Sequence, residues 1–163
     1  MITVNLCVKI SNYGQESILV RYRIFLQKVP TLRRGARKVV STLRKRGYEI
    51  GIVSTGIDLL VNNVASRAGI DITVANGLET GSAGLLTGHG IFRVDLLRKD
   101  IALRRMLRER GYALNQCIAV GDSRYDTRFL KAAGLGIAIG GDEEAKKAAD
   151  LVVSELVEIL EYL

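Results

Sequence analysis

Hydrophobic residues recur along the chain in two alternating patterns, which predict strands and helices in turn. Residues Ile2–Ile10 alternate apolar with polar side chains, as expected of a strand with one apolar face. Residues Tyr13–Val29 and Leu32–Arg46 carry apolar side chains at helical spacing, and Pro30 separates these two predicted helices. From residue 48 onwards, short apolar strands and amphipathic helices alternate to the last residues.

The later part of the chain predicts five strands and five helices. The strands are Tyr48–Val53, Ile72–Ala75, Cys117–Val120, Leu135–Ile139 and Leu151–Val153. The helices are Asp58–Ala68, Val94–Arg110, Tyr125–Ala133, Glu143–Ala149 and Glu155–Tyr162. A segment rich in Gly, Ser and Thr near residues 76–91 predicts a β-hairpin. Such alternation predicts an α/β fold with a parallel, Rossmann-like sheet and helices on both faces.

Composition places the chain among single-domain proteins with a substantial core, because 48% of its 163 residues are hydrophobic. Its apolar runs are too short to span a membrane, and Met1-Ile2-Thr3 lacks the basic region of a signal peptide, so we expect a cytoplasmic protein with no membrane partner. Cys7 and Cys117 lie in apolar runs and predict reduced core residues. His89 is the single histidine, which excludes sites built on several histidines of one chain.

Two acidic residues follow the predicted strand 117–120 at a spacing of four. Gly121 allows a sharp turn, Asp122 comes directly after it, and Asp126 follows one helical turn later. Asp122 therefore projects from the carboxyl end of a parallel strand, where open α/β sheets bind their ligands. Two close carboxylates favour a hard cation such as Mg²⁺, although a helix N-cap followed by a first-turn acid has the same pattern.

Two further features predict an anion site. Ser54, Thr55 and Gly56 come directly after a predicted strand and before a predicted helix, where hydroxyl and backbone N–H groups can bind phosphate. An ordinary strand–helix turn has the same composition. Lys99 lies near the start of the predicted helix 94–110, and alone it is typical of solvated surface.

Taken together, these motifs resemble the phosphatases of the haloacid dehalogenase (HAD) superfamily. The run from residue 30 to residue 163 is most similar to the phosphoserine phosphatase group. The likeness covers residues 33–48, the Ser54 motif, the hairpin segment, Lys99 and the run Val120–Asp126. Residues 30–163 are thus expected to form a HAD-like core domain, and residues 1–29 an N-terminal strand plus helix.

The resemblance implies hydrolysis of a phosphomonoester of a small metabolite through an aspartyl-phosphate, with Mg²⁺ as cofactor. Ser54, Thr55 and Gly56 would bind phosphoryl oxygens, and Lys99 would offset their charge. Asp122 and Asp126 would be the metal site, with Asp126 ligating the ion or its water. Such chemistry rests on positioning and charge neutralisation.

Two departures from the family pattern affect the expected activity. Ser123 and Tyr125 stand where close relatives have Gly and Asn, which affects the choice of substrate. More seriously, the family's nucleophile is the first Asp of an Asp-x-Asp pair after the first strand, and residues 1–57 contain no aspartate. Without that carboxylate, covalent catalysis by this chain alone should fail.

Two explanations for the lacking nucleophile stay open. In one, residues 1–29 are the remnant of a helical cap that follows the nucleophile strand, so the chain begins late. In the other, Ile2–Ile10 takes the place of that strand, with Asn5 and Cys7 at the Asp-x-Asp spacing. This second case would give a catalytically inactive phosphate-binding protein or regulatory module. An empty central strand position would leave backbone groups unpaired, which favours the second explanation slightly.

Charge distribution supports one rival function. The net charge is +7, and residues 1–57 hold eleven Lys and Arg against two Glu. One face of the predicted helix 32–46 carries Arg33, Arg34, Arg37, Lys38, Arg44, Lys45 and Arg46. Such a face is compatible with a nucleic-acid-binding module, but aromatic platforms are lacking there and a solvated helix face explains it more simply. An uncapped cleft and the apolar side of helix 13–29 weakly favour a homodimer.

Overall fold

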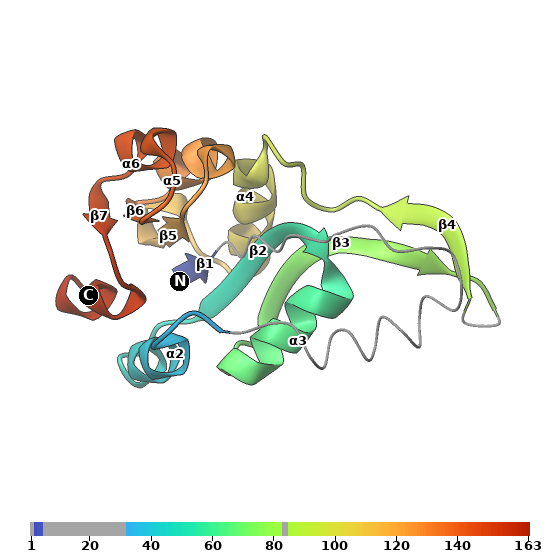
Figure 1. Cartoon of the computed structure of the whole chain (residues 1–163), viewed down its shortest axis with the longest axis horizontal. Coiled ribbons are helices and arrows are strands. Elements are labelled where there is room, and N and C mark those ends of the chain that lie inside the picture. Colours follow the sequence, from blue (N-terminus) through green and yellow to red (C-terminus); the bar gives the residue numbers. More distant parts are fainter. Residues whose placement is uncertain (1, 5–31, 83–84) are drawn as a thin grey trace.

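A mixed β-sheet with helices on both faces forms the protein (Figure 1). The computed structural model describes residues 2–4, 32–82 and 85–163. Seven strands in this part of the chain follow the spatial order β4-β3-β2-β1-β5-β6-β7. They are β1 (Ile2–Val4), β2 (Ile50–Ile57), β3 (Ile72–Thr80), β4 (Leu86–Ile91), β5 (Ile118–Gly121), β6 (Leu135–Ile139) and β7 (Leu151–Val153). Neighbouring strands are parallel except the β3–β4 hairpin, which is antiparallel.

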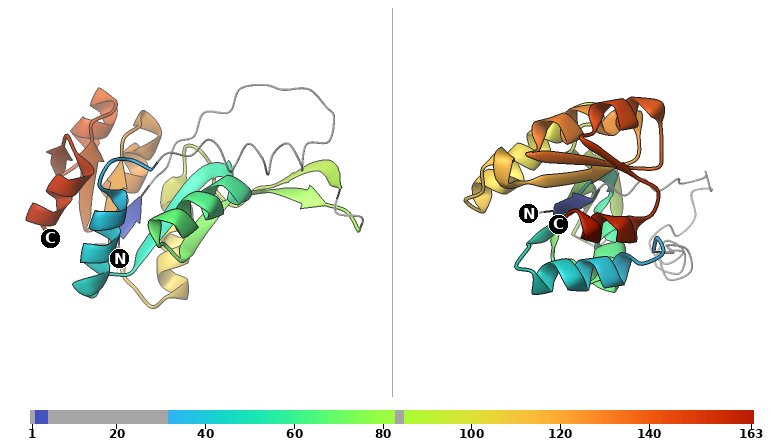
Figure 2. Two further views of the ribbon diagram at one scale, coloured as in Figure 1. Left: turned by 60° about the horizontal axis from the view of Figure 1, so that its bottom comes forward. Right: turned by 90° about the vertical axis from the view of Figure 1, so that its left-hand side faces the viewer.

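The helices form two layers, one on each side of the sheet (Figure 2). The α-helices are α2 (Ala36–Lys45), α3 (Asp58–Ala68), α4 (Lys99–Glu109), α5 (Thr127–Ala132) and α6 (Glu143–Ala148). Short 3₁₀ helices are η1 (Leu114–Gln116), η2 (Arg124–Asp126) and η3 (Leu156–Glu161). Helices α2 and α3 and the η3 segment contribute to one core cluster, and α4, α5 and α6 to the other. The predicted α/β class is therefore confirmed.

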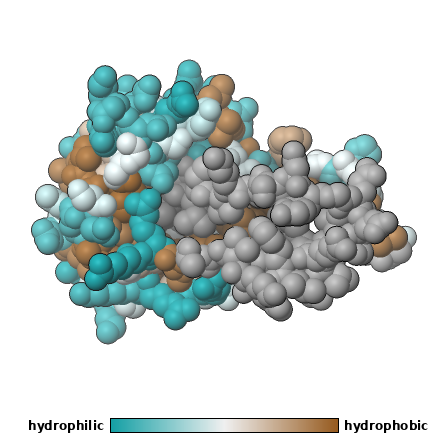
Figure 3. All heavy atoms as spheres, viewed as in Figure 1, coloured by the Kyte–Doolittle hydropathy of each residue, from teal (hydrophilic) through white to brown (hydrophobic). Residues whose placement is uncertain are grey.

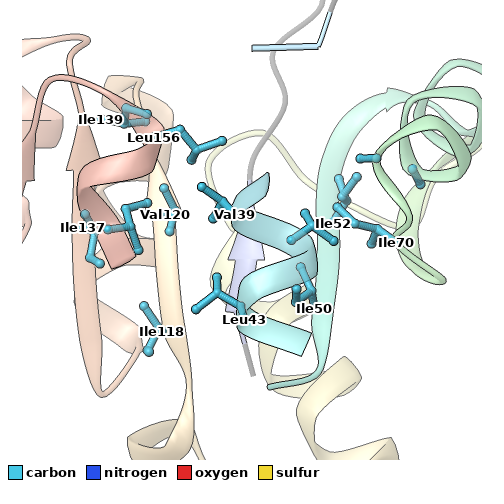
Figure 4. Close-up of a cluster of buried hydrophobic side chains, with 14 of the residues drawn as sticks. Val39, Leu43, Ile50, Ile52, Ile70, Ile118, Val120, Ile137, Ile139 and Leu156 are labelled. Carbon is cyan, nitrogen blue, oxygen red and sulfur yellow. The ribbon is translucent and has the colours of Figure 1, made fainter. Parts of the chain in front are cut away.

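Alternating side chains of the strands supply both core clusters. Ile52 of β2 packs with α2 and α3, whereas the next residue, Val53, packs with α4. In the first cluster, Val39 and Leu43 of α2 lie between the side chains of β2 and those of β5 and β6 (Figure 4). This alternation follows from the pleat of a strand, which sends successive side chains to opposite faces. Strand β2 is therefore buried on both faces where these residues lie.

Strand β1 lies between β2 and β5, in the centre of the sheet. Ile2 is paired with Ile50 on one side and with Ile118 on the other, both in parallel register. The rest of the predicted strand 2–10, including Asn5 and Cys7, lies outside the described residues, and so does the predicted helix 13–29. The division of the chain at residue 29 stays a prediction.

Two helices begin later than their hydrophobic spacing predicts. Helix α2 begins at Ala36 instead of residue 32, after Gly35, whose φ of 79° ends the preceding turn in the left-handed region. Helix α4 begins at Lys99 instead of residue 94, because the side chain of Asp95 accepts hydrogen bonds from the N–H groups of residues 97 and 98 and holds a separate turn. Lys99 is thus the first residue of its helix. At the other end of the chain, the predicted helix 155–162 is the 3₁₀ segment η3.

The predicted hairpin is present as strands β3 and β4, which extend away from the rest of the sheet in Figure 1. Strand β3 runs on to Thr80, five residues past its predicted end, because it continues from the parallel sheet directly into the hairpin. In the described part of the chain, no helix is both long and apolar enough to cross a membrane.

Hydrophilic residues cover the region of α2 and of α6 in the space-filling view, and hydrophobic residues show between the two layers (Figure 3). Four of the seven cations on the predicted basic face contact other parts of the chain. Arg33 and Arg44 pair with Asp122 and Asp71, and Arg37 and Arg46 donate to backbone carbonyls of residues 67 and 160. Much of this basic face is therefore committed to contacts within the protein.

Candidate functional site

The predicted site residues lie along one edge of the sheet, where the parallel strands end. Ser54 is in the last half of β2, and Asp122 comes directly after β5. Strand β1 runs parallel between β2 and β5, so the carboxyl ends of all three strands share this edge. Such an edge is the usual ligand site of an open α/β sheet.

A buried ion pair joins the start of α4 to the loop after β5. The Nζ atom of Lys99 donates to Oδ1 of Asp126 at 2.8 Å. The side chain of Lys99 is 4% exposed and that of Asp126 is 0% exposed. An ammonium group at a helix N-terminus is disfavoured by the helix dipole, so the carboxylate of Asp126 is what stabilises its charge there.

Asp126 also shapes the loop that carries Asp122. Its Oδ2 atom accepts hydrogen bonds from the backbone N–H groups of Asp122 at 3.3 Å and Ser123 at 3.1 Å. The loop is tight, because a Cβ on Gly121 would lie 2.8 Å from the Cβ of Asp126. Glycine at position 121 therefore permits the close approach that the sequence predicted. Both carboxylate oxygens of Asp126 are engaged by groups of the protein itself.

Asp122 differs from Asp126 in that one of its oxygens has no hydrogen-bond partner within residues 2–4, 32–82 and 85–163. Its Oδ2 atom lies 3.3 Å from the guanidinium of Arg33, whereas Oδ1 is buried and has no hydrogen-bond partner in the described part of the chain. Burial and the neighbouring carboxylate of Asp126 raise the pKa of Asp122 above its ordinary value, and Arg33 and Lys99 partly oppose this shift. A buried, unpaired carboxylate oxygen is a place where a cation would be stabilised.

Residues after β6 support the Asp122 loop from the other side. The backbone N–H of Asp142 donates to the carbonyl of Asp122 at 3.0 Å, and its carboxylate accepts from the N–H of Arg124 at 3.0 Å. The chain passes so close that a Cβ on Gly141 would lie 1.8 Å from the Asp122 carbonyl oxygen. The backbone of the Asp122 loop is thus held by hydrogen bonds from both sides, three of them accepted by the carboxylates of Asp126 and Asp142.

The Ser54 motif is an irregularity of β2 instead of a separate turn. Ser54 is paired with Ala75 and Ile57 with Asn76, so residues 55 and 56 are extra residues in the strand. Ser54 is buried, and its hydroxyl accepts a hydrogen bond from the N–H of Gly56 at 3.1 Å. Its predicted role in binding phosphate stays a prediction.

Asn76 connects this irregular part of β2 to the segment before α4. Its Nδ2 group donates to the carbonyls of Thr55 at 3.1 Å and Val94 at 3.0 Å. Its Oδ1 atom accepts from the N–H groups of Arg93 and Val94, both at 2.8 Å. Both donors and both acceptor positions of this side-chain amide are therefore used. The sequence predicted Asn76 only as part of the hairpin segment and did not indicate this connecting role.

A pocket of about 680 Å³ opens beside Thr55. It is lined by Thr55, Asn76, Phe92, Arg93, Val94, Asp95, Leu96, Arg98, Ile101 and Ala102. Phe92 is 88% exposed, so the pocket is bordered by apolar surface as well as by charged groups. A volume of this order accommodates a small metabolite.

The donor set for a cation is small in the described residues. No group of three or more His, Cys, Asp or Glu side chains gathers there in a way that could hold a metal ion. Of the two predicted metal ligands, Asp126 uses both oxygens within the protein, and Asp122 has the buried Oδ1. The residues present therefore fit a hard cation bound by Asp122. Asp126 supports this site through its hydrogen bonds to the backbone of residues 122 and 123.

The structure brings three of the predicted site residues into one connected cluster, namely Lys99, Asp122 and Asp126. Sequence reasoning missed Arg33 as a partner of Asp122, because the residue was assigned to a helix face. The run Gly140-Gly141-Asp142 at a strand end predicted only a minor role at the rim of the site, whereas Asp142 contacts the Asp122 loop directly.

Comparison with protein families gives a match over most of the chain. The family described as haloacid dehalogenase-like hydrolase matches residues 13–131. The phosphoserine phosphatase of Streptomyces coelicolor is 36% identical over 121 residues, which are 74% of this chain and 29% of that protein. The phosphoserine phosphatase of Streptococcus thermophilus is 34% identical over 137 residues, or 80% of this chain and 61% of that protein. The chain thus spans less than two thirds of these curated relatives.

Solved structures give the same result for the fold. A crystal structure of phosphoserine phosphatase in its apo form superimposes with a TM-score of 0.78 at 30% sequence identity. The match covers 89% of this chain and 73% of that one. The resemblance that the motifs predicted is therefore confirmed in sequence and in structure.

Proposed function

The chain belongs to the haloacid dehalogenase-like hydrolases, and on that premise we propose that it is a magnesium-dependent phosphomonoester hydrolase of the phosphoserine phosphatase type. One observation carries the proposal. A buried lysine–aspartate pair, Lys99 with Asp126, lies beside a second carboxylate, Asp122, whose buried Oδ1 atom has no partner among the described residues. An arrangement of this kind suits a dianionic ligand together with a divalent cation.

The roles of the residues follow from their partners. Asp122 would hold Mg²⁺ through Oδ1, and the bound ion would neutralise charge on the phosphoryl oxygens. Asp126 would position Lys99 and the Asp122 loop at the same time, since its oxygens contact both. Lys99, with the hydroxyl and N–H groups of Ser54, Thr55 and Gly56, would bind the phosphoryl group.

The substrate we propose is the phosphomonoester of a small metabolite. The relatives are phosphoserine phosphatases, which makes phosphoserine the first compound to test. The pocket beside Thr55 has a volume suited to the organic part of such a molecule. Ser123 and Tyr125 depart from the pattern of the resembling phosphatases, so a related phosphomonoester is the next compound to test.

A second candidate, phosphate binding without turnover, has its own supporting observation. Residues 1–57 contain no aspartate, and the strand between β2 and β5 is Ile2–Val4 in the described part of the chain. The aspartyl-phosphate route needs a carboxylate nucleophile from that position, and an amide such as that of Asn5 is a poor substitute. The binding groups would then serve a regulatory or sensing purpose.

Release of inorganic phosphate distinguishes the two candidates. p-Nitrophenyl phosphate and phosphoserine are incubated with the chain in MgCl₂ and, separately, in EDTA. The matched variants are Asp122→Asn and Asp71→Asn, which remove the same charge from the site and from the 81% exposed side chain of Asp71. Turnover that needs Mg²⁺ and is lost only in Asp122→Asn supports the hydrolase.

Other outcomes of that assay are equally informative. Absence of turnover, together with phosphate binding that Asp122→Asn abolishes, supports the binding-only candidate. Absence of both turnover and binding contradicts the two candidates together.

A further inference from the structure

Three ion pairs involve residues of the loop after β5 or of the segments that contact it. Lys99 pairs with Asp126, Arg124 lies 3.9 Å from Asp142, and Arg33 lies 3.3 Å from Asp122. The Lys99 pair is buried, whereas the Arg33 side chain is 44% exposed and that of Asp122 is 28% exposed. The Arg33 pair involves Asp122, whose Oδ1 is the proposed magnesium ligand, and this pair is partly open to solvent.

Arg33 reaches Asp122 from a turn that is firmly held. The N–H of Ala36 donates to the carbonyl of Arg33 at 3.1 Å and closes the turn before α2. Gly35 within it packs against η3, since a Cβ there would lie 2.5 Å from Cγ1 of Val157. The backbone of this turn is thus held in place, while the Arg33 side chain is 44% exposed and has solvent on one side.

We infer that Arg33 is a built-in counter-cation of Asp122, which Mg²⁺ displaces and which then binds the phosphoryl group. This inference rests on the proposed function, because it concerns the same site. A divalent ion at Oδ1 of Asp122 would repel a guanidinium near Oδ2 of the same carboxylate. A phosphoryl dianion beside that ion would attract it, and the planar guanidinium matches two phosphoryl oxygens at once.

The inference predicts effects of opposite sign on the two ligands. Arg33→Gln removes the competitor of Mg²⁺, so Mg²⁺ alone should bind about two- to fivefold more tightly, the range expected for a partly exposed ion pair. The same change removes a ligand of phosphate, so phosphate in saturating Mg²⁺ should bind about tenfold more weakly. A residue that only supported the fold would weaken both ligands together.

Isothermal titration calorimetry of the whole chain provides the test. MgCl₂ is titrated first, and inorganic phosphate is then titrated in saturating MgCl₂, both at low ionic strength. Arg34→Gln is the matched control, because it removes the same charge from the exposed neighbouring residue. Tighter Mg²⁺ and weaker phosphate binding in Arg33→Gln, with Arg34→Gln close to wild type, support the inference.

The remaining outcomes separate the inference from the proposed function. The inference is overturned if Arg33→Gln binds Mg²⁺ and phosphate as Arg34→Gln does, or if Arg33→Gln binds Mg²⁺ more weakly than the wild type. The proposed function stands in these cases, provided that the wild type binds both ligands. If the wild type binds neither ligand, the proposed function fails. The inference, which rests on that function, is then overturned with it.

Discussion

The ammonium group of Lys99 lies 2.8 Å from the carboxylate of Asp126, and neither side chain is more than 4% exposed. Each of these charges would be costly to bury alone, so each depends on the other. Asp126 additionally accepts hydrogen bonds from the backbone of residues 122 and 123. The pair therefore couples the start of α4 to the loop that presents Asp122.

Loss of the lysine should destabilise the fold strongly. Lys99→Met leaves Asp126 buried without its cation, and we expect the free energy of unfolding to fall by about 3–5 kcal/mol. Adding Asp126→Asn removes the uncompensated charge and keeps an acceptor for the two N–H groups, so the double variant should recover part of that loss. Urea denaturation of the wild type, both single variants and the double variant measures this coupling.

An exposed pair of the same length is the control for this experiment. Lys146 and Glu143 also lie 2.8 Å apart, on the surface of α6. Lys146→Met should leave the unfolding midpoint nearly unchanged, because exposed ion pairs contribute little. Additive effects of Lys99→Met and Asp126→Asn would contradict the coupling.

Two adjacent glycines after β6 should differ in their tolerance of alanine. Gly140 and Gly141 have φ values of 58° and 75°, so alanine at either position costs roughly 1–2 kcal/mol of backbone strain. A Cβ on Gly140 meets nothing within 4 Å, whereas one on Gly141 would lie 1.8 Å from the carbonyl oxygen of Asp122. Gly141→Ala should therefore lower the unfolding midpoint much further and weaken Mg²⁺ binding. Equal midpoints for the two variants would show that the Asp122 loop is not held this tightly.

The raised pKa of Asp122 gives a prediction about stability and pH. Folding raises this pKa above the ordinary value of 3.8, so the folded state holds the proton more firmly than the unfolded state does. The resulting contribution to stability is present below pH 3.8 and is lost as the pH rises through the folded pKa. Asp122→Asn, which cannot ionise, should therefore be more stable than the wild type at neutral pH.

Thermal unfolding in EDTA between pH 3.5 and pH 8 measures this difference. We expect Asp122→Asn to melt about 2–4 °C higher at pH 7, the shift that roughly 1 kcal/mol produces in a chain of this size. The difference in melting temperature between Asp122→Asn and the wild type should become smaller as the pH falls towards 3.5. The control variant Asp71→Asn should melt at the wild-type temperature throughout this range. A wild type more stable than Asp122→Asn at pH 8 would refute the prediction.

Asn76 should be intolerant of a change to aspartate. Its two N–H donors face the carbonyls of Thr55 and Val94, and Asn76→Asp would place an oxygen against them. We expect a loss of about 2–4 kcal/mol in the free energy of unfolding. Asn62→Asp is the matched control, since the Oδ1 atom of Asn62 only accepts a hydrogen bond from Thr73 and that acceptor is kept. Chemical denaturation that ranks the two variants equally would argue against the role of Asn76.

Local signals explain where the sequence predicted the fold correctly. The bounds of α3 were predicted to the residue, because Asp58 lies in its first turn and Gly69 follows in the left-handed region. The predicted start of α4 was wrong for the opposite reason. Apolar residues in 94–98 keep the helical spacing, and only the side-chain hydrogen bonds of Asp95 show that this segment is a separate turn.

Contacts between distant parts of the chain explain what the sequence could not predict about the site. The motif after β5 and Lys99 predicted the cluster, because residue type and strand position carry that information. The pairing of Arg33 with Asp122 joins residues 89 positions apart and depends on where the turn before α2 is packed. The full engagement of Asp126 by Lys99 and by backbone N–H groups likewise appears only in three dimensions.

Ligand-induced stabilisation tests the central claim most directly, namely that the Lys99–Asp126–Asp122 cluster binds phosphate with Mg²⁺. The melting temperature is measured with MgCl₂, with inorganic phosphate and with both, for the wild type and for Asp122→Asn. Ligand at about 100 times its dissociation constant adds roughly 2.7 kcal/mol to the folded state. We predict a clear rise for the wild type with both ligands together and none for Asp122→Asn. An equal rise in both proteins, or none in either, would contradict the account.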